Sequence, residues 1–206
     1  MKSDEIMVTN RDLEIIELVG RFGMMNIEHI RIAFDLSIPR SYQIMSKIGK
    51  LGYLKTQRIL HADMAIYTLT KKASIEFGFK EHKHVSLGSY KHDILSTKYC
   101  LILSKKYNCK YLTEKELRAS FQIGDKGHTP DFKLLNNGKS IAVEVELTLK
   151  GKRRIESILK FYKTCLDYSE IIYICSKETI NVFEKFTKNL DFISVYDKKE
   201  FLNDNR

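Results

Sequence analysis

The sequence has little of the residues that mark several common classes of protein. Only two of its 206 residues are proline and ten are glycine, which excludes collagen-like and low-complexity chains. No apolar run approaches the roughly 18–20 residues of a membrane-spanning helix, and the polar start of the chain lacks the apolar stretch of a signal peptide. The four cysteines have no CxxC spacing, so we expect neither a zinc knuckle nor a secreted disulfide framework. These absences favour a cytoplasmic protein with reduced cysteines and no membrane span.

The composition supplies apolar material and an excess of positive charge. Hydrophobic residues make up 43% of the chain, enough for a packed core in one or two domains. Lysine and arginine number 35 against 26 acidic residues, a net charge of +9. Basic proteins of this kind often bind a polyanion, although many bind none. Whether the basic residues cluster therefore decides between a protein that binds a polyanion and one that binds none.

The chain has two halves with clear hydrophobic patterns, separated by a polar stretch at residues 81–88. We expect a first domain at residues 1–80, a linker at 81–88 and a second domain at 89–206. Caps and apolar spacing in the first half predict three helices, two strands and a last short helix. Their expected ranges are 9–22, 26–34, 39–51, 53–60, 65–69 and 70–77. This order is typical of a winged helix-turn-helix.

The third predicted helix and the hairpin after it form a window without acidic residues. From Ile38 to Arg58 there are five basic residues and no acidic one. The helix has an apolar stripe and a separate polar face, and such a helix fits the major groove of DNA. The residues that we expect to contact DNA here are Arg40, Gln43, Lys47, Lys50, Lys55 and Arg58. The alternative is a solvated basic face on a winged helix that binds proteins.

The second half alternates helices and strands. Helices are expected at 90–107, after Thr113, at 152–167 and at 177–190, and strands at 110–112, 129–135, 140–149, 170–175 and 192–196. Thr113 and Glu116 form a capping box, and Asn136-Asn-Gly138 predicts a hairpin turn. The fold class is therefore α+β or α/β, with a mixed β-sheet flanked by helices.

The hairpin carries the residues with the most specific chemistry. Glu144 and Glu146 lie two apart on one strand, so they share a face at a separation of about 7 Å. Asp131 lies on the other predicted strand of the hairpin, at the end near the two glutamates. Three carboxylates at one point repel unless a divalent cation neutralises them, and Mg²⁺ or Mn²⁺ prefers such oxygen ligands. The alternative is that the glutamates form the solvent face of a half-exposed strand.

A basic helix follows the hairpin. Six basic residues and one acid lie between Lys150 and Lys163. Lys152, Arg153 and Arg154 at its start are candidates to hold a DNA backbone against the cation. The metal, in turn, activates water and stabilises the charge that develops on a phosphodiester.

Pro130-Asp131 followed by Glu144-Val-Glu146 resembles the PD-(D/E)XK motif of restriction endonuclease-like nucleases. The resemblance implies that Asp131 and Glu144 bind Mg²⁺. The family usually has lysine where this chain has Glu146, and Lys150 could supply the missing cation. An acidic residue on an early helix of the family corresponds best to Glu114.

The order of both halves, from Thr9 to Tyr168, resembles the plasmid replication-relaxation family, which is related to MOBC-type conjugative relaxases. The motifs that carry this resemblance are Lys91-His-Asp-Ile-Leu95, Thr-Glu-Lys-Glu-Leu-Arg118, Pro130-Asp131 and Glu-Val-Glu146. It implies an endonuclease or nickase that recognises an origin on double-stranded mobile-element DNA, with a homodimer and accessory mobilization proteins as further partners.

Two other interpretations stay open. The nuclease-like half could be a dimerisation or partner module of a non-catalytic DNA-binding regulator, or the protein could cut both strands as restriction enzymes do. His128, beside Thr129-Pro130, could touch substrate or metal, but a loop histidine more often does neither. Tyr162 and Tyr168 are interpreted as structural, because no histidine pair of the HUH type accompanies them.

Overall fold

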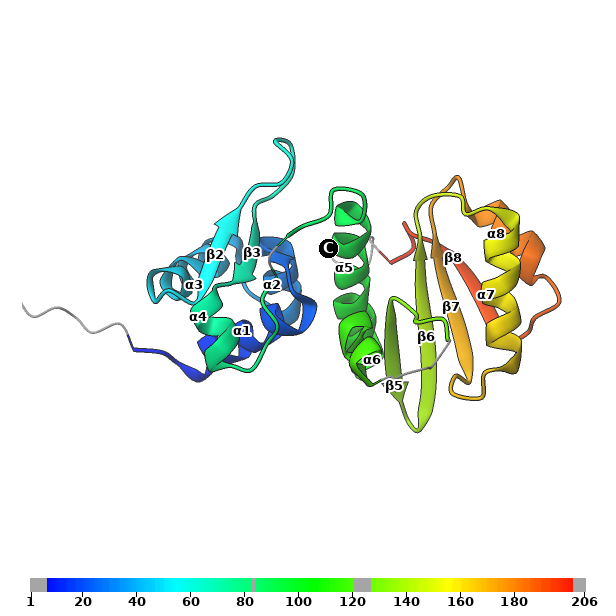
Figure 1. Cartoon of the computed structure of the whole chain (residues 1–206), viewed down its shortest axis with the longest axis horizontal. Coiled ribbons are helices and arrows are strands. Elements are labelled where there is room, and N and C mark those ends of the chain that lie inside the picture. The colour runs from blue at the N-terminus through cyan, green and yellow to red at the C-terminus, as the bar shows by residue number, and fades with distance from the viewer. Residues whose placement is uncertain (1–6, 83, 121–126, 202–206) are drawn as a thin grey trace, which may run out of the picture. The chain divides into compact units, whose positions relative to one another are not determined.

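The computed structural model describes residues 7–82, 84–120 and 127–201. The chain divides into two compact units, Met1–Leu101 and Ile102–Arg206 (Figure 1). Helix α5 (Tyr90–Lys106) crosses this division, so the stretch that we expected to be a linker lies within the first unit; its residue 83 is outside the described residues. Both units combine helices with a sheet, which confirms the mixed fold class. No helix in the described ranges is long and apolar enough to cross a membrane.

The first unit packs short helices around a small antiparallel sheet. Its elements are α1 (Asn10–Phe22), β1 (Met25–Asn26), α2 (Ile27–Phe34), α3 (Ile38–Lys50), β2 (Leu54–Gln57), β3 (Ile66–Leu69) and α4 (Lys71–Glu76). The sheet has the order β1-β3-β2. The order of helices and hairpin is the one that the sequence predicts, and the two-residue β1 adds an unpredicted third strand.

Local hydrogen bonds fix where the first helices begin. Thr9 and Asp12 form the predicted capping box at α1, with Thr9 N 2.7 Å from Asp12 Oδ2. Asn26 caps α2, and His29 takes the place of the usual acidic partner by accepting from Asn26 N through Nδ1. The other ring nitrogen of His29 lies 3.0 Å from the carbonyl oxygen of Ile94 in α5. Burial lowers the pKa of His29 to about 3, so the ring is neutral and acts as a structural link.

The predicted apolar faces of α1 and α3 form the core of this unit. Six of their residues are at most 5% exposed: Ile15, Ile16, Val19, Ile44, Met45 and Ile48. Full burial of one such side chain stabilises the fold by about 1.5–3 kcal/mol. Leu51, the residue that ends α3, is only partly buried.

The second unit contains a five-stranded mixed sheet. Its elements after α5 are β4 (Lys110–Thr113), α6 (Glu114–Ser120), β5 (Phe132–Asn136), β6 (Lys139–Glu146), α7 (Lys152–Thr164), β7 (Glu170–Cys175), α8 (Ile180–Thr187) and β8 (Ile193–Asp197). The strand order is β4-β5-β6-β7-β8. The first three strands are antiparallel neighbours, whereas β7 and β8 run parallel to β6. Figure 1 shows α7 and α8 on the same face of this sheet.

The turn between β5 and β6 sets the register of the hairpin. Asn137 and Gly138 have positive φ angles of 48° and 80°, as the predicted Asn-Asn-Gly turn requires. The register pairs Phe132 with Val143. Asp131, which directly precedes Phe132, therefore comes opposite Glu144 and on the same face of the sheet.

The interpretation of β6 as a half-exposed strand is wrong. Every residue from Ile141 to Glu146 is buried, including both glutamates. The physical reason is that β6 lies between β5 and β7 in the middle of the sheet, and that α7 covers the face that carries Ala142 and Glu144. The strand ends at Glu146 rather than at Leu149.

Candidate active site

Three carboxylates lie on one face of the second sheet. Glu144 and Glu146 occupy the end of β6, and each is 2% exposed. Asp131, the residue directly before β5, accepts a hydrogen bond of 2.7 Å from the backbone N–H of Val145 through Oδ2. This bond holds the Asp131 carboxyl group at the strand that carries both glutamates. The sequence-predicted carboxylates are therefore together, although Asp131 is only partly buried.

The Glu144 carboxylate is held by two side chains from other parts of the chain. His128 Nε2 lies 2.5 Å from Glu144 Oε1, and the Tyr162 hydroxyl of α7 donates to the same oxygen. The rings of His128 and Tyr162 meet edge to face, with centroids 5.6 Å apart. Burial raises the pKa of Glu144, and the nearby Asp131 charge adds to this effect, whereas the His128 contact opposes it.

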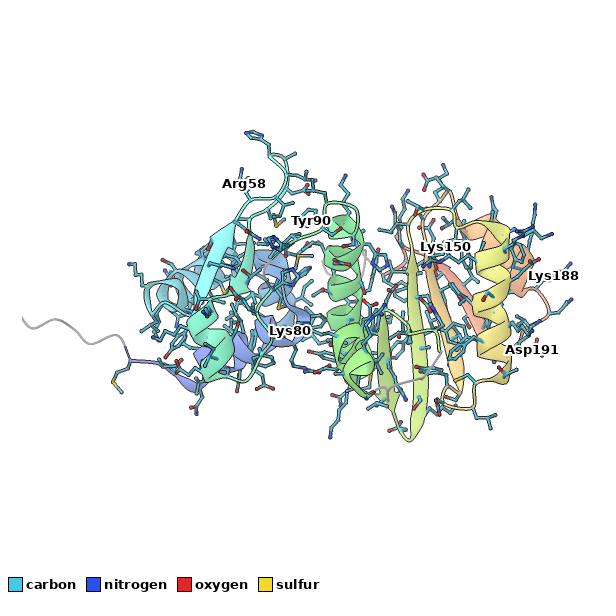
Figure 2. The ribbon with its side chains drawn as sticks, in the orientation of Figure 1. Arg58, Lys80, Tyr90, Lys150, Lys188 and Asp191 are labelled. Atoms are coloured by element: carbon cyan, nitrogen blue, oxygen red, sulfur yellow. The ribbon has the colours of Figure 1, made fainter. Side chains whose placement is uncertain are left out.

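Glu146 has a cation as its partner. The Lys150 ammonium pairs with Glu146 Oε1 from the loop after β6, where Figure 2 labels it. Burial raises the pKa of Glu146 to about 7, against the lowering effect of Lys150. The charges of Glu144 and Asp131 raise it further. At neutral pH this carboxyl group is thus poised between its two protonation states, which suits a group that takes up or releases a proton.

The donor atoms fit a hard divalent cation, but the side chains are already engaged with each other. Three carboxylates supply the oxygen ligands that Mg²⁺ and Mn²⁺ prefer. Among the described residues, however, no group of three or more His, Cys, Asp or Glu side chains is arranged to hold a metal ion. A cation that bound here would compete with Lys150 for Glu146 and with His128 for Glu144.

A further polar atom lies in the same layer. Tyr173 of β7 is the direct neighbour of Glu144 in the parallel pair, and it is fully buried. Its hydroxyl has no hydrogen-bond partner within the described part of the chain. Burial raises the pKa of Tyr173, and the charges of Glu144 and Glu146 raise it further, so the hydroxyl keeps its proton.

The backbone of Glu114 contacts this site, but its carboxylate pairs with a residue outside the site. Its backbone N–H donates to the carbonyl oxygen of Asp131 over 3.1 Å. Its carboxylate instead accepts from Arg118, four residues on in α6, at 2.6 and 2.9 Å. The structure therefore does not bring the Glu114 side chain to the other carboxylates by any hydrogen bond that it describes.

The basic start of α7 is solvent-exposed. Lys152, Arg153 and Arg154 all lie on the surface, and Lys152 makes a long contact of 3.8 Å with Glu156. Arg154 is seven residues before Phe161, so both lie on one flank of the helix. The Phe161 ring packs against His128 with centroids 6.2 Å apart. Arg154 thus lies on the flank of α7 that faces the carboxylate site.

The candidate DNA-contacting residues of the first unit divide into two groups. Arg40, Gln43, Lys50 and Arg58 are exposed, and Lys55 is partly buried. Arg40 Nη1 donates to Gln43 Oε1 over 3.3 Å, so the two act as one polar group on α3. Lys47 instead forms an ion pair of 2.5 Å with the buried Asp12 of α1. This contact gives Lys47 a structural role in addition to any contact with DNA.

Two residues of this site were not predicted to belong to it. We interpreted His128 as a loop histidine and Tyr162 as structural, yet both contact Glu144. Tyr162 lies seven residues after Ile155, so the two share one face of α7, and both are buried. Only the position of α7 over β6 shows that this buried face meets a carboxylate.

A comparison with models of known protein families finds no match to this sequence, and a comparison with curated proteins finds none either.

Proposed function

We propose that this chain is a sequence-specific DNA-binding protein whose second unit is a Mg²⁺- or Mn²⁺-dependent endonuclease or nickase. One observation carries the proposal: two buried glutamates lie two positions apart on a central strand, with Asp131 beside them. Burial of an ion costs several kcal/mol even after relaxation, and a hydrophobic pair would pack at this place without that cost. Buried carboxylates with raised pKa values in such a cluster are typical of catalytic sites.

The proposed chemistry assigns a role to each side chain. Asp131 and Glu144 would hold the cation, which supplies Lewis acidity when bound. Glu146 Oε1 accepts the proton of the attacking water, whose oxygen forms the new bond to phosphorus as the bond to the sugar oxygen breaks. The departing oxygen takes a proton from solvent. Lys150, freed from Glu146 as that carboxyl group is protonated, stabilises the negative charge on the phosphate.

The DNA-binding part of the proposal rests on the exposed cations of both units. The order of helices and hairpin in the first unit, together with exposed Arg40, Gln43 and Lys50 on α3, supports a winged helix that reads the major groove. In the mixed sheet, Pro130-Asp131 directly precedes β5, and Glu144-Val-Glu146 ends the antiparallel neighbour β6; this arrangement supports a restriction endonuclease-like second domain. Within this proposal the protein nicks an origin on mobile-element DNA as a relaxase does, as a homodimer or with accessory mobilization proteins.

A supercoiled-plasmid assay tests the activity directly. DNA that carries the sequence next to the protein's own gene is incubated with the protein and Mg²⁺ or Mn²⁺. We expect open circles with wild type, and none with Asp131→Asn or Glu144→Gln. The matched control is Glu156→Gln, an exposed glutamate on α7 that should leave cleavage unchanged. Linear product would instead favour a restriction-type nuclease that cuts both strands.

A second function, a non-catalytic DNA-binding regulator, is favoured by a different observation. Each of the three carboxylates already has a partner inside the protein: the Val145 amide, His128 with Tyr162, and Lys150. If that arrangement is the final one, the cluster is a closed polar network rather than a cation site. Wild type would then bind DNA with strong salt dependence, and cleave nothing with either metal.

A further inference from the structure

Two large apolar side chains of α3 lie in solvent instead of in the core. Ile38 and Tyr42 are each 50% exposed, although the buried face of the same helix carries Ile44, Met45 and Ile48. Because Ile38 and Tyr42 are four residues apart, their side chains are neighbours on one flank of the helix. They form a small exposed apolar edge that is separate from the core face.

This apolar edge adjoins a cationic region of the same helix. Arg40 and Gln43 lie toward the other side of the exposed face of α3, where the Arg40 guanidinium donates to the Gln43 side chain over 3.3 Å. Lys50 is exposed at the end of the helix. The first turn of α3 has no acidic residue, and the sequence has none from there to Arg58. A partner that covers this face must therefore be negatively charged and offer apolar groups beside its charges.

Double-stranded DNA meets both requirements in its major groove. Phosphates supply negative charge along both sides of the groove, and the C5-methyl group of thymine is the apolar group that projects into it. In helix-turn-helix proteins, the residues that contact base edges lie at the N-terminal end of the recognition helix. Ile38 is the first residue of α3, and Tyr42 follows one turn later. The apolar edge is therefore at the end of the helix that would meet the bases.

We propose that Ile38 and Tyr42 read thymine methyl groups in the major groove and thereby set part of the sequence preference of this protein. The inference rests on the DNA binding that we proposed for the first unit. Arg40 and Lys50 contact phosphates and strengthen binding to every sequence, whereas the apolar edge favours sites that contain thymine. Removal of one methyl group from water favours thymine over uracil about fourfold at each contacted position.

Replacement of thymine by uracil tests this role because it removes only the C5-methyl group. The preferred site of the full-length protein is first selected from a randomised duplex library, with EDTA present so that no DNA is cut. Each thymine of that site is then replaced by uracil, and affinity is measured by fluorescence anisotropy. We expect wild-type affinity to fall about fourfold at one or two of these positions. The double variant with Ile38→Ala and Tyr42→Ala should bind the thymine and uracil duplexes equally.

Two other variants serve as controls. Ile75→Ala removes an isoleucine that is 72% exposed on α4, and it should keep the full preference for thymine. Arg40→Ala should weaken binding to both duplexes by the same factor, because a phosphate contact carries no sequence information. Each variant should unfold at the same urea concentration as wild type, since every replaced side chain lies largely in solvent.

The outcomes separate this inference from the proposed function. If wild type binds a selected site but binds its uracil counterparts equally well, the inference is overturned while DNA binding stands. If wild type selects no site and shows no salt-dependent binding to duplex DNA, the DNA-binding proposal fails, and the role of Ile38 and Tyr42 fails with it. A double variant that keeps the preference for thymine would also overturn the inference, and would leave the apolar edge to a protein partner.

Discussion

The substitution Glu146→Gln should stabilise the protein at pH 8 while it removes the proposed proton acceptor. Burial raises the pKa of Glu146 to about 7 in the folded chain, from an ordinary value of 4.5. A folded-state pKa above the unfolded one means that stability is fully present below about pH 4.5 and is lost as the pH rises to about 7. Each pH unit between the two values corresponds to about 1.4 kcal/mol, so the ionised carboxylate costs about 3 kcal/mol at pH 8. At pH 5 the cost is below about 1 kcal/mol.

Glutamine keeps the shape of the side chain without its charge. The contribution of the Lys150 pair is already included in the pKa of Glu146, and Lys150 itself is partly exposed, so water can solvate its ammonium group. We therefore expect the free energy of unfolding of Glu146→Gln to exceed that of wild type by about 2–3 kcal/mol at pH 8, and by less than about 1 kcal/mol at pH 5.

Equilibrium urea unfolding of the full chain at both pH values, followed by circular dichroism, measures this difference. The matched control is Glu156→Gln, because Glu156 is also four residues from a lysine but is exposed on α7. An exposed pair of this kind contributes at most about 0.5 kcal/mol, so the control should change little at either pH. The reasoning is refuted if Glu146→Gln is no more stable than wild type at pH 8, or if its gain is the same at both pH values.

Three further predictions concern other parts of the fold. Lys47→Ala leaves the buried Asp12 without its cation and should destabilise the first unit by about 1–3 kcal/mol in urea unfolding. Its control is Arg40→Ala, an exposed position where stability should not change. This control should instead lower the affinity for DNA, and the slope of log affinity against log salt concentration should be smaller by about 1. Gly138→Ala should cost about 1 kcal/mol in the same assay, because the turn needs a φ of 80° there. Burial lowers the pKa of His29 to about 3, so its contribution to stability is present above pH 6.5 and is lost as the pH falls. Hydrogen exchange in the first unit should therefore show a loss of about 2 kcal/mol of stability between pH 7 and pH 5. A His29→Asn variant that is stable enough to measure should not show this loss.

Much of the fold could be predicted because its signals are local in the chain. A capping box joins residues three apart, so Thr9 with Asp12 and Thr113 with Glu116 predicted where α1 and α6 begin, and both boxes are present. A hairpin turn depends on the two residues that take positive φ, so Asn137 and Gly138 predicted the junction of β5 and β6. The ends of strands were predicted less well, since hydrogen bonds to a neighbouring strand decide where pairing stops.

The candidate site also has features that the sequence predicted and features that it did not. The alternation of side chains along β6 was enough to place Glu144 and Glu146 on one face, and the Pro130-Asp131 motif was enough to suggest a third carboxylate. Whether that face meets water depends on what packs over it, and α7 reaches it only through the parallel crossover to β7.

Local patterns in the chain were enough to predict the type and order of most elements, the turn of the central hairpin and the identity of the three carboxylates. The folded structure was needed to show that the glutamates are buried, that His128 and Tyr162 hold Glu144, and that Lys47 pairs with Asp12 from 35 positions away. The two groups of features differ in how far apart along the chain the interacting residues lie. Caps, turns and side-chain alternation depend on neighbours within a few residues, whereas burial and pKa shifts depend on atoms that only chain folding brings together.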